Sequence, residues 1–193
     1  MKRISPHVLS LLAAPLLLSF LLYGAQDSEE GEPAPRAGVT VIAVRHAEKR
    51  SDDARDPALS EAGETRSKTL SRLLSKSGVT HVYSTAYRRT RATVAPLAEL
   101  LRLEVNDYSP REIESFVKEL RELPAGSVAL VAGHSNTTPG LVLAMGGEVD
   151  DLESMRGTSV LGEEQYDRLF VTTLPPNGGA VKTLELRYGD ESK

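Results

Sequence analysis

Two short apolar segments, each followed by a histidine, constrain the fold of this 193-residue chain more than any other feature. Residues 39–45 read VTVIAVR, and residues 127–132 read SVALVA. Continuous apolar runs of this length, the first rich in β-branched residues, are typical of strands buried on both faces of a sheet. His46 directly follows the first run, and His134 follows the second after one glycine. Both histidines are therefore expected at carboxyl ends of strands, where open α/β sheets bind their ligands.

The segments around these runs predict helices that alternate with strands. Ser60 is expected to cap a helix that continues to about Lys76 and is ended by Gly78. Ser109 and Pro110 are expected to begin another helix. This order predicts a three-layer α/β sandwich with a mostly parallel central sheet, helices on both faces and a C-terminal hairpin. The other predicted elements are strands over 80–84, 169–174 and 181–188 and helices over 86–101, 110–123 and 138–145, with a hairpin turn at 175–179.

The first 25 residues have the composition of a secretory signal peptide. A short basic start precedes an apolar run over residues 8–23 and the small pair Gly24-Ala25. Cleavage after Ala25 would leave Tyr23 where a small residue is preferred, so an uncleaved N-terminal membrane anchor is the alternative. We therefore expect a periplasmic or secreted protein.

The rest of the chain divides into a tether and one domain. Residues 26–37 are acidic and contain several Pro and Gly residues, which predicts a flexible linker. Residues 38–190 form the expected globular domain. Contact with a membrane is expected only through the N-terminal segment, if that segment is not cleaved.

The composition excludes several classes of protein. The chain has no Cys, which excludes a thiol nucleophile, a Cys-bound metal and disulfides. A formal net charge of −4 argues against a nucleic-acid-binding protein, which needs a basic face. The strand-end histidines belong to no metal-ligand motif such as H-E-x-x-H, so we expect neither a metal nor another cofactor. Of the other two histidines, His7 lies in the predicted signal peptide and His81 among apolar strand residues, where a structural role is expected.

Arginines accompany both histidines at the predicted sheet edge. Arg45 precedes His46, and the segment 83–93, YSTAYRRTRAT, places three arginines where a strand gives way to a helix. A helix N-terminus favours anions, and guanidinium groups match phosphate oxygens in a bidentate way. A solvated basic helix face and two unrelated polar strand ends are the alternative interpretation. Together, however, these groups supply a nucleophile and cationic clamps, which phosphoryl transfer requires.

Several segments resemble the blocks of the histidine phosphatase superfamily, which includes the phosphoglycerate mutases. Arg45-His46-Ala47-Glu48 resembles the family's Arg-His-Gly-Glu signature, although Ala47 replaces the usual glycine. The remaining matches are Ser84 to Thr93 with the block Ser-x-x-x-x-Arg-x-x-x-Thr, 133–137 with the Gly-His block, 59–63 with the Leu-Thr-x-x-Gly helix start, and 166–170 with the tail of short exported members. The resemblance covers roughly residues 39–188.

The resemblance implies a role for each matching residue. His46 is similar to the phosphorylated nucleophile, and Arg45, Arg89 and His134 are similar to the groups that hold the phosphoryl oxygens. The alignment of Ser84 and Thr93 selects Arg89 rather than its neighbour Arg88. The family's proton donor, a carboxylic acid, normally follows the second block. That region offers several carboxylates here, and Asp107 is the candidate that we select from Glu104, Asp107, Glu112 and Glu114.

These roles imply a metal-independent phosphomonoester hydrolase that works through a phosphohistidine on His46. A non-catalytic phosphate-ligand binding protein on the same fold and a phosphomutase are the alternatives. A mutase needs a closed cap that excludes water, and the segment between Leu103 and Pro124 is short for one. Phosphorylated small molecules such as sugar phosphates, phosphorylated glycolipids and phosphoproteins remain as substrates.

Overall fold

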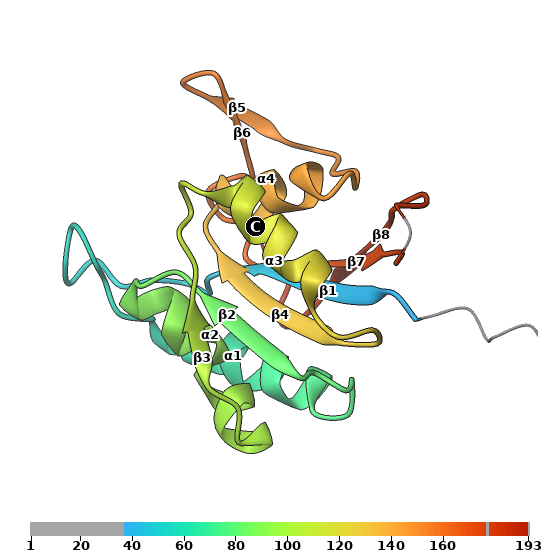
Figure 1. Ribbon diagram of the computed structural model, residues 1–193. Coiled ribbons are helices and arrows are strands. Elements are labelled where there is room, and N and C mark those ends of the chain that lie inside the picture. The colour runs from blue at the N-terminus through green and yellow to red at the C-terminus, as the bar shows by residue number, and fades with distance from the viewer. Residues whose placement is uncertain (1–36, 177, 193) are drawn as a thin grey trace, which may run out of the picture. The chain divides into compact units, whose positions relative to one another are not determined.

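The computed structural model describes residues 37–176 and 178–192 (Figure 1). The predicted signal peptide, and all of the predicted linker but its last residue, lie outside the described residues. Within the described residues, no helix combines the length and the apolar character needed to span a membrane. The elements are β1 Val39–Arg45, α1 Glu61–Leu74, β2 His81–Ser84, α2 Arg88–Leu101, β3 Val105–Asp107, α3 Ile113–Glu122, β4 Val128–Gly133, α4 Thr137–Ala144, β5 Glu153–Met155, β6 Thr158–Val160, β7 Arg168–Leu174 and β8 Lys182–Arg187.

A six-stranded sheet of order β3-β2-β4-β1-β7-β8 forms the centre of the domain. Strands β1 to β4 are mutually parallel where they pair, whereas β7 runs antiparallel to β1 and forms a hairpin with β8. The register of β1 and β4 pairs Arg45 with Gly133. The residue that follows each of these is a histidine, so the two predicted functional histidines lie side by side at one sheet edge.

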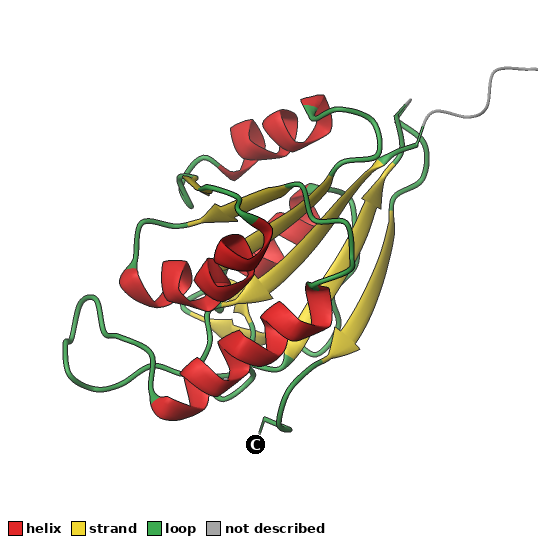
Figure 2. Ribbon diagram, turned by 90° about the horizontal axis from the view of Figure 1, so that it is seen from below, coloured by secondary structure: helices red, strands yellow, loops and turns green. Residues whose placement is uncertain are grey.

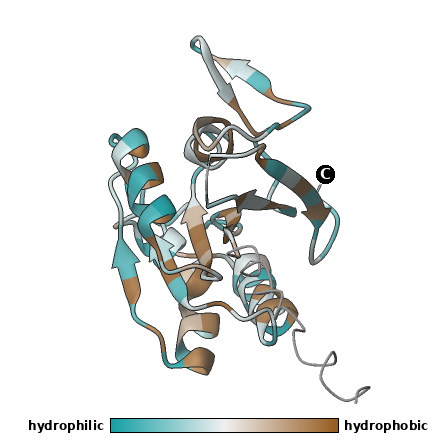
Figure 3. Cartoon of the chain, turned by 45° about the vertical axis from the view of Figure 1, so that its right-hand side comes forward, coloured by the Kyte–Doolittle hydropathy of each residue, from teal (hydrophilic) through white to brown (hydrophobic). Residues whose placement is uncertain are grey.

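Helices cover both faces of this sheet, as the sequence predicts (Figures 1 and 2). The odd-numbered apolar residues of β1, such as Val41, pack with α3 and α4, and even-numbered ones, such as Ile42, pack with α1 and α2. The alternation arises because successive strand side chains point to opposite faces. Apolar colour accordingly follows the central strands in Figure 3, whereas the helices carry both apolar and polar residues.

Three strands were not predicted, and one helix begins later than predicted. Strand β3 has only three residues, mostly exposed, and β5 and β6 form a separate two-stranded hairpin with no buried run. Such short exposed strands have no apolar pattern from which to predict them. The helix expected from Pro110 begins at Ile113, because Ser109 and Glu112 close a turn first, with the Glu112 amide donating to the Ser109 carbonyl at 3.1 Å.

The start of α1 is fastened to the segment after β1. The Ser60 hydroxyl accepts a hydrogen bond from the Gly63 amide at 3.2 Å, which confirms Ser60 as the helix cap. The Ser60 amide in turn donates to the Glu48 carbonyl at 2.9 Å. Gly63 packs so closely that a Cβ there would lie 2.2 Å from the same carbonyl oxygen. The backbone two residues beyond His46 is thus held by a contact that only glycine permits.

We predict that Gly63→Ala destabilises the domain by about 1–3 kcal/mol, because the added methyl group forces two backbone segments apart. Urea unfolding followed by circular dichroism would measure the change. Gly140→Ala is the matched control, since a Cβ there meets nothing within 4 Å in helix α4. Equal unfolding midpoints for the two variants would contradict the close approach at Gly63.

Candidate active site

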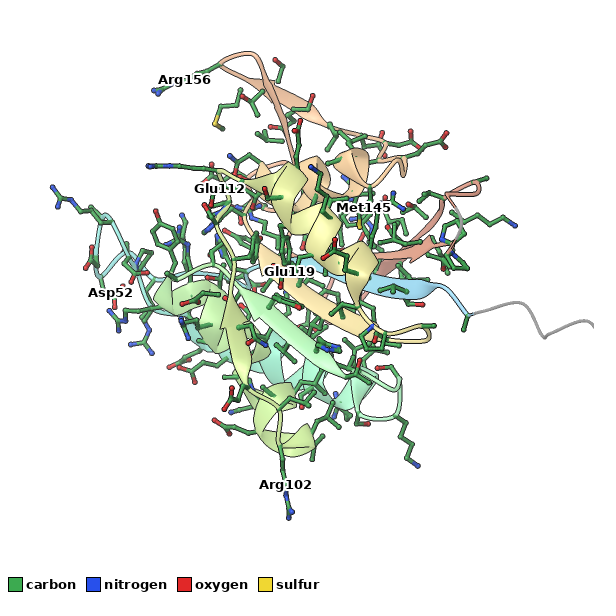
Figure 4. The ribbon with its side chains drawn as sticks, in the orientation of Figure 1. Asp52, Arg102, Glu112, Glu119, Met145 and Arg156 are labelled. Atoms are coloured by element: carbon green, nitrogen blue, oxygen red, sulfur yellow. The ribbon has the colours of Figure 1, made fainter. Side chains whose placement is uncertain are left out.

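The structure brings His46 and His134 together at the carboxyl ends of β1 and β4. Their ring centroids lie 5.5 Å apart, with the rings edge to face at 69°. The His46 amide donates to the Gly133 carbonyl at 2.9 Å, so the parallel pairing continues up to the nucleophile candidate itself. Asp52, in the loop after β1, and Glu112, before α3, lie on the same side of the molecule, to which the arrowheads of β2 and β4 point (Figure 4).

The surroundings of His46 fix its tautomer and its charge. Its ring Nδ1 lies 2.8 Å from the Ala47 carbonyl oxygen. A carbonyl can only accept, so Nδ1 carries the hydrogen and Nε2 keeps its lone pair. Burial lowers the pKa of His46 to about 3, although the hydrogen bond to the Ala47 carbonyl raises it. The charges of Arg45 and Arg89 lower the pKa as well. His46 is therefore a neutral imidazole whose Nε2 is available as a nucleophile at neutral pH.

Arg45 is anchored on one side and unpaired on the other. Its Nη1 donates to the carbonyls of Gly162 and Glu163, both at 2.8 Å, and its guanidinium lies 4.2 Å from the centroid of the Tyr166 ring. Its Nε is buried without a hydrogen-bond partner. Desolvation lowers the pKa of this guanidinium, although it stays charged. The carbonyls of the segment after β6 thus position a cation whose buried Nε remains without a partner.

Arg89, the second residue of α2, stacks on Tyr87 and reaches His134. Its guanidinium carbon lies 4.6 Å from the Tyr87 ring centroid, and its Nη2 lies 3.4 Å from His134 Nδ1. Both Nε and Nη1 are buried and make no hydrogen bond. The nearest acid is Asp56, 3.6 Å from Nη1, which is an ion-pair distance too long for a hydrogen bond. Arg89 therefore contributes two donors without partners to the same sheet edge.

A chain of hydroxyl groups holds His134. Its Nε2 lies 3.0 Å from Thr85 Oγ1, which lies 2.8 Å from Thr90 Oγ1, and Thr90 donates to the Tyr87 carbonyl at 2.8 Å. This chain lets Nε2 donate and leaves Nδ1 facing the guanidinium of Arg89. Burial lowers the pKa of His134 to about 4, and the charges of Arg89 and Arg45 lower it further. His134 is therefore also neutral in the empty site.

Asp56, Tyr87 and Tyr166 join the site although the sequence did not predict a role for them. Asp56, from the loop after β1, accepts a hydrogen bond from the Arg88 amide at 2.9 Å and so occupies the first free N–H of helix α2. Tyr166 and Tyr87 support the two arginines through their rings. Tyr166 and Tyr87 lie in the segments 166–170 and 83–93, but only contacts across the fold reveal what these rings do. Asp56 lies in a polar loop whose sequence carries no such signal.

The replacement of the usual glycine by Ala47 leaves the backbone undisturbed. Ala47 is fully buried and does not adopt a positive φ. Its amide donates to the Thr93 hydroxyl at 2.9 Å, which ties the end of β1 to helix α2. The family threonine at position 93 thus positions the backbone next to His46. Glycine is not required at position 47.

The structure does not bring Asp107 to the histidines. Asp107 ends β3, the edge strand, and two strands separate β3 from β1. Its carboxylate is half exposed and forms a salt bridge with Arg91. His81 lies at the opposite end of the sheet, at the start of β2, with its Nδ1 2.8 Å from the Thr80 hydroxyl. The geometry therefore gives His81 a structural environment and leaves Asp107 outside the site.

No group of three or more His, Cys, Asp or Glu side chains in the described part of the chain is arranged to hold a metal ion. The site instead consists of two neutral imidazoles and two guanidinium groups. Three buried guanidinium N–H groups lack partners there. Such an arrangement suits a tetrahedral anion with several acceptor oxygens.

Comparison with known proteins agrees with this geometry. Residues 41–129 match the model of the histidine phosphatase superfamily, branch 1. This match confirms the resemblance to that superfamily that the sequence motifs indicate, and the fold is similar to that of solved phosphatases. A search of curated proteins returns no significant match.

Solved structures of phosphatases share the fold at low sequence identity. The protein histidine phosphatase SixA, solved with tungstate, is 17% identical, with a TM-score of 0.58 over 77% of this chain and 96% of that one. An Escherichia coli protein assigned as an α-ribazole-5′-P phosphatase is 14% identical, with a TM-score of 0.61 over 80% and 100%. A mycobacterial glucosyl-3-phosphoglycerate phosphatase is 16% identical, with a TM-score of 0.53 over 79% and 99%.

The two buried histidines should make folding stability depend on pH. Each has a folded-state pKa below the ordinary value of 6.5, so the unfolded chain binds more protons as the pH falls from about 6.5 to 4. Each histidine should then lower the free energy of unfolding by up to about 1.4 kcal/mol per pH unit over that interval. Urea unfolding at pH 7, 6, 5 and 4 would show the loss.

The double variant His46→Gln, His134→Gln should lose stability less steeply than the wild type between pH 6.5 and 4. His81→Gln serves as a control that removes a histidine at the opposite end of the sheet. Parallel curves for the double variant and the wild type would contradict the neutral, buried state of the two rings.

Proposed function

We propose that this protein is a metal-independent phosphomonoester hydrolase that forms a phosphohistidine on His46. The observation that carries the proposal is a neutral imidazole, with a free lone pair on Nε2, next to three buried guanidinium N–H groups without partners. These N–H groups are suited to oxygens that can only accept hydrogen bonds, and a phosphoryl group supplies three such oxygens. The similarity of the fold to that of several phosphatases supports the same reaction class.

In the first step, Nε2 of His46 attacks phosphorus in line with the leaving oxygen. The new P–N bond forms as the P–O bond breaks, and the electron pair of that bond leaves with the oxygen. Arg45 and Arg89 offset the negative charge on the equatorial oxygens, which accept hydrogen bonds from their unpartnered N–H groups. The bond from Nδ1 to the Ala47 carbonyl keeps the imidazole oriented and stabilises the positive charge that develops on the ring.

In the second step, water attacks phosphorus and the P–N bond breaks. Nε2 regains its lone pair, and inorganic phosphate is released. The same guanidinium groups stabilise the charge in this step, because the phosphoryl oxygens occupy the same places. His134, between Arg89 and the Thr85 hydroxyl, borders the phosphoryl group from the end of β4.

The position of Asp107 affects which leaving groups the site can release. Its carboxylate pairs with Arg91 on the edge strand, so it is poorly placed to protonate an oxygen bound near His46. Asp56 is the carboxylate beside the site in the described structure, and it already faces Arg89 and the Arg88 amide. We therefore infer that substrates whose leaving group departs without strong acid catalysis react fastest.

Turnover of 4-nitrophenyl phosphate tests the proposal. His46→Ala should lower kcat/KM by at least about 10³-fold, because it removes the nucleophile. Arg89→Ala should lower it by about 10²–10³-fold through the loss of charge stabilisation. His81→Ala, at the far end of the sheet, should retain wild-type turnover, and EDTA should leave the wild-type rate unchanged.

The same assay separates the alternatives. Tight phosphate binding without turnover would favour a binding protein, and transfer of phosphate to an added alcohol in preference to water would favour a mutase. Loss of activity on chelation, restored by added metal, would contradict the metal-independent mechanism. Acid quenching during turnover should trap a phosphoryl group on the peptide that contains His46.

A further inference from the structure

A hollow lies beside His134 and Arg89, two of the side chains that border the proposed phosphoryl site. Its volume is ≈ 310 Å³. Its other lining residues are Tyr87, Pro110, Arg111, Asn136 and Thr137. Because it adjoins the place where a phosphoryl group would be held, it is the space into which the leaving group of a substrate would extend.

Arg111 is the cation of this hollow that has no partner of its own. Its side chain is exposed and forms no hydrogen bond or salt bridge with any other residue that the structure describes. Of the neighbouring arginines, Arg91 pairs with Asp107, and Arg89 faces Asp56 and keeps its unpaired donors for the proposed phosphoryl site. No carboxylate lines the hollow. A negative charge placed there would therefore meet an available guanidinium.

The segment that carries Arg111 is held firmly against the sheet. The amide of Tyr108 donates to the Ser84 carbonyl at 3.1 Å, and its ring stacks on Phe116 with a centroid distance of 4.4 Å. A turn between Ser109 and Glu112 follows. Arg111 is thus presented by a short, pinned turn, which fixes where its backbone stands beside the hollow. This turn lies in the region where the family resemblance led us to expect a carboxylic acid.

The remaining walls suit a polar, flat leaving group. The Tyr87 ring is 41% exposed and meets the His134 ring edge to face at 5.0 Å. Asn136 is exposed and caps no helix with its side chain, so its amide is free to donate or accept a hydrogen bond. The net charge of −4 gives the protein no general attraction for anions, and a local cation would have to supply it.

We propose that Arg111 makes this hollow a second anion subsite, so that the preferred substrate carries a further negatively charged group on its leaving group. The shared chemistry is a carboxylate or a second phosphate at a distance from the phosphoryl group that is hydrolysed. This inference rests on the proposed phosphatase function, since it assigns the place of the leaving group. It makes Arg111 a specificity-determining residue.

A matched pair of aryl phosphates tests the subsite. The probes are 4-carboxyphenyl phosphate and 4-carbamoylphenyl phosphate, which have nearly the same shape and differ in one negative charge. The wild type should prefer the anionic probe by about tenfold in kcat/KM, as a charge-assisted hydrogen bond provides. In Arg111→Gln the ratio of the two kcat/KM values should fall to about one, and Arg111→Lys should give an intermediate ratio.

Arg72→Gln is the control, because it removes the same charge from the exposed end of helix α1. It should keep the wild-type ratio, so a loss of preference there would assign the effect to net charge and overturn the proposal. A wild-type ratio of one, or an unchanged ratio in Arg111→Gln, would also overturn it.

Binding of both probes to His46→Ala separates this inference from the proposed function. If the wild type hydrolyses neither probe but His46→Ala binds the anionic one about tenfold more tightly, the subsite stands and the phosphatase proposal fails. If both probes bind His46→Ala equally, the subsite is wrong even where the wild type is an active phosphatase.

Discussion

The parallel pairing of β1 with β4 is the constraint on which the site depends. Its register sets Arg45 opposite Gly133, and the hydrogen bond from the His46 amide to the Gly133 carbonyl extends the pairing by one residue. A shift by one residue would turn the alternating side chains of a strand to the opposite face. Both faces of this sheet are buried under helices, so such a shift would disrupt the core as well as separate the two imidazole rings.

The chemistry of the site follows from the buried hydrogen-bond donors that the surrounding chain leaves without partners. Carbonyls after β6 hold one side of Arg45, and Tyr87 supports Arg89, yet three of their buried N–H groups have no partner. Unpaired buried donors are costly to keep in the empty protein. A bound phosphoryl group would satisfy them, and the same cations help to keep His46 neutral and nucleophilic. Charge and hydrogen bonding thus both favour a phosphoryl group beside His46.

The sequence predicted the elements that have a strong pattern. The buried strands β1 and β4, the cap at Ser60 and the C-terminal hairpin all follow from local rules, and strand-end placement was enough to bring His46 to His134. Roles for particular arginines came from the family resemblance. Asp107 was selected by its position in the sequence. It lies on an exposed three-residue strand at the sheet edge, which has no apolar pattern, so its distance from His46 could not be inferred. Contacts made across the fold, such as those of Asp56, have no local signal.

The most direct test of the central claim is a crystal structure of the protein with orthovanadate or tungstate. We expect an oxyanion bordered by both histidine rings, with its metal atom beside Nε2 of His46 and its oxygens accepting hydrogen bonds from Arg45 Nε and from Arg89. The proposed mechanism would be contradicted by an oxyanion that binds elsewhere and leaves the place beside His46 and His134 empty. It would also be contradicted by a His46 ring whose Nε2 faces away from the bound anion.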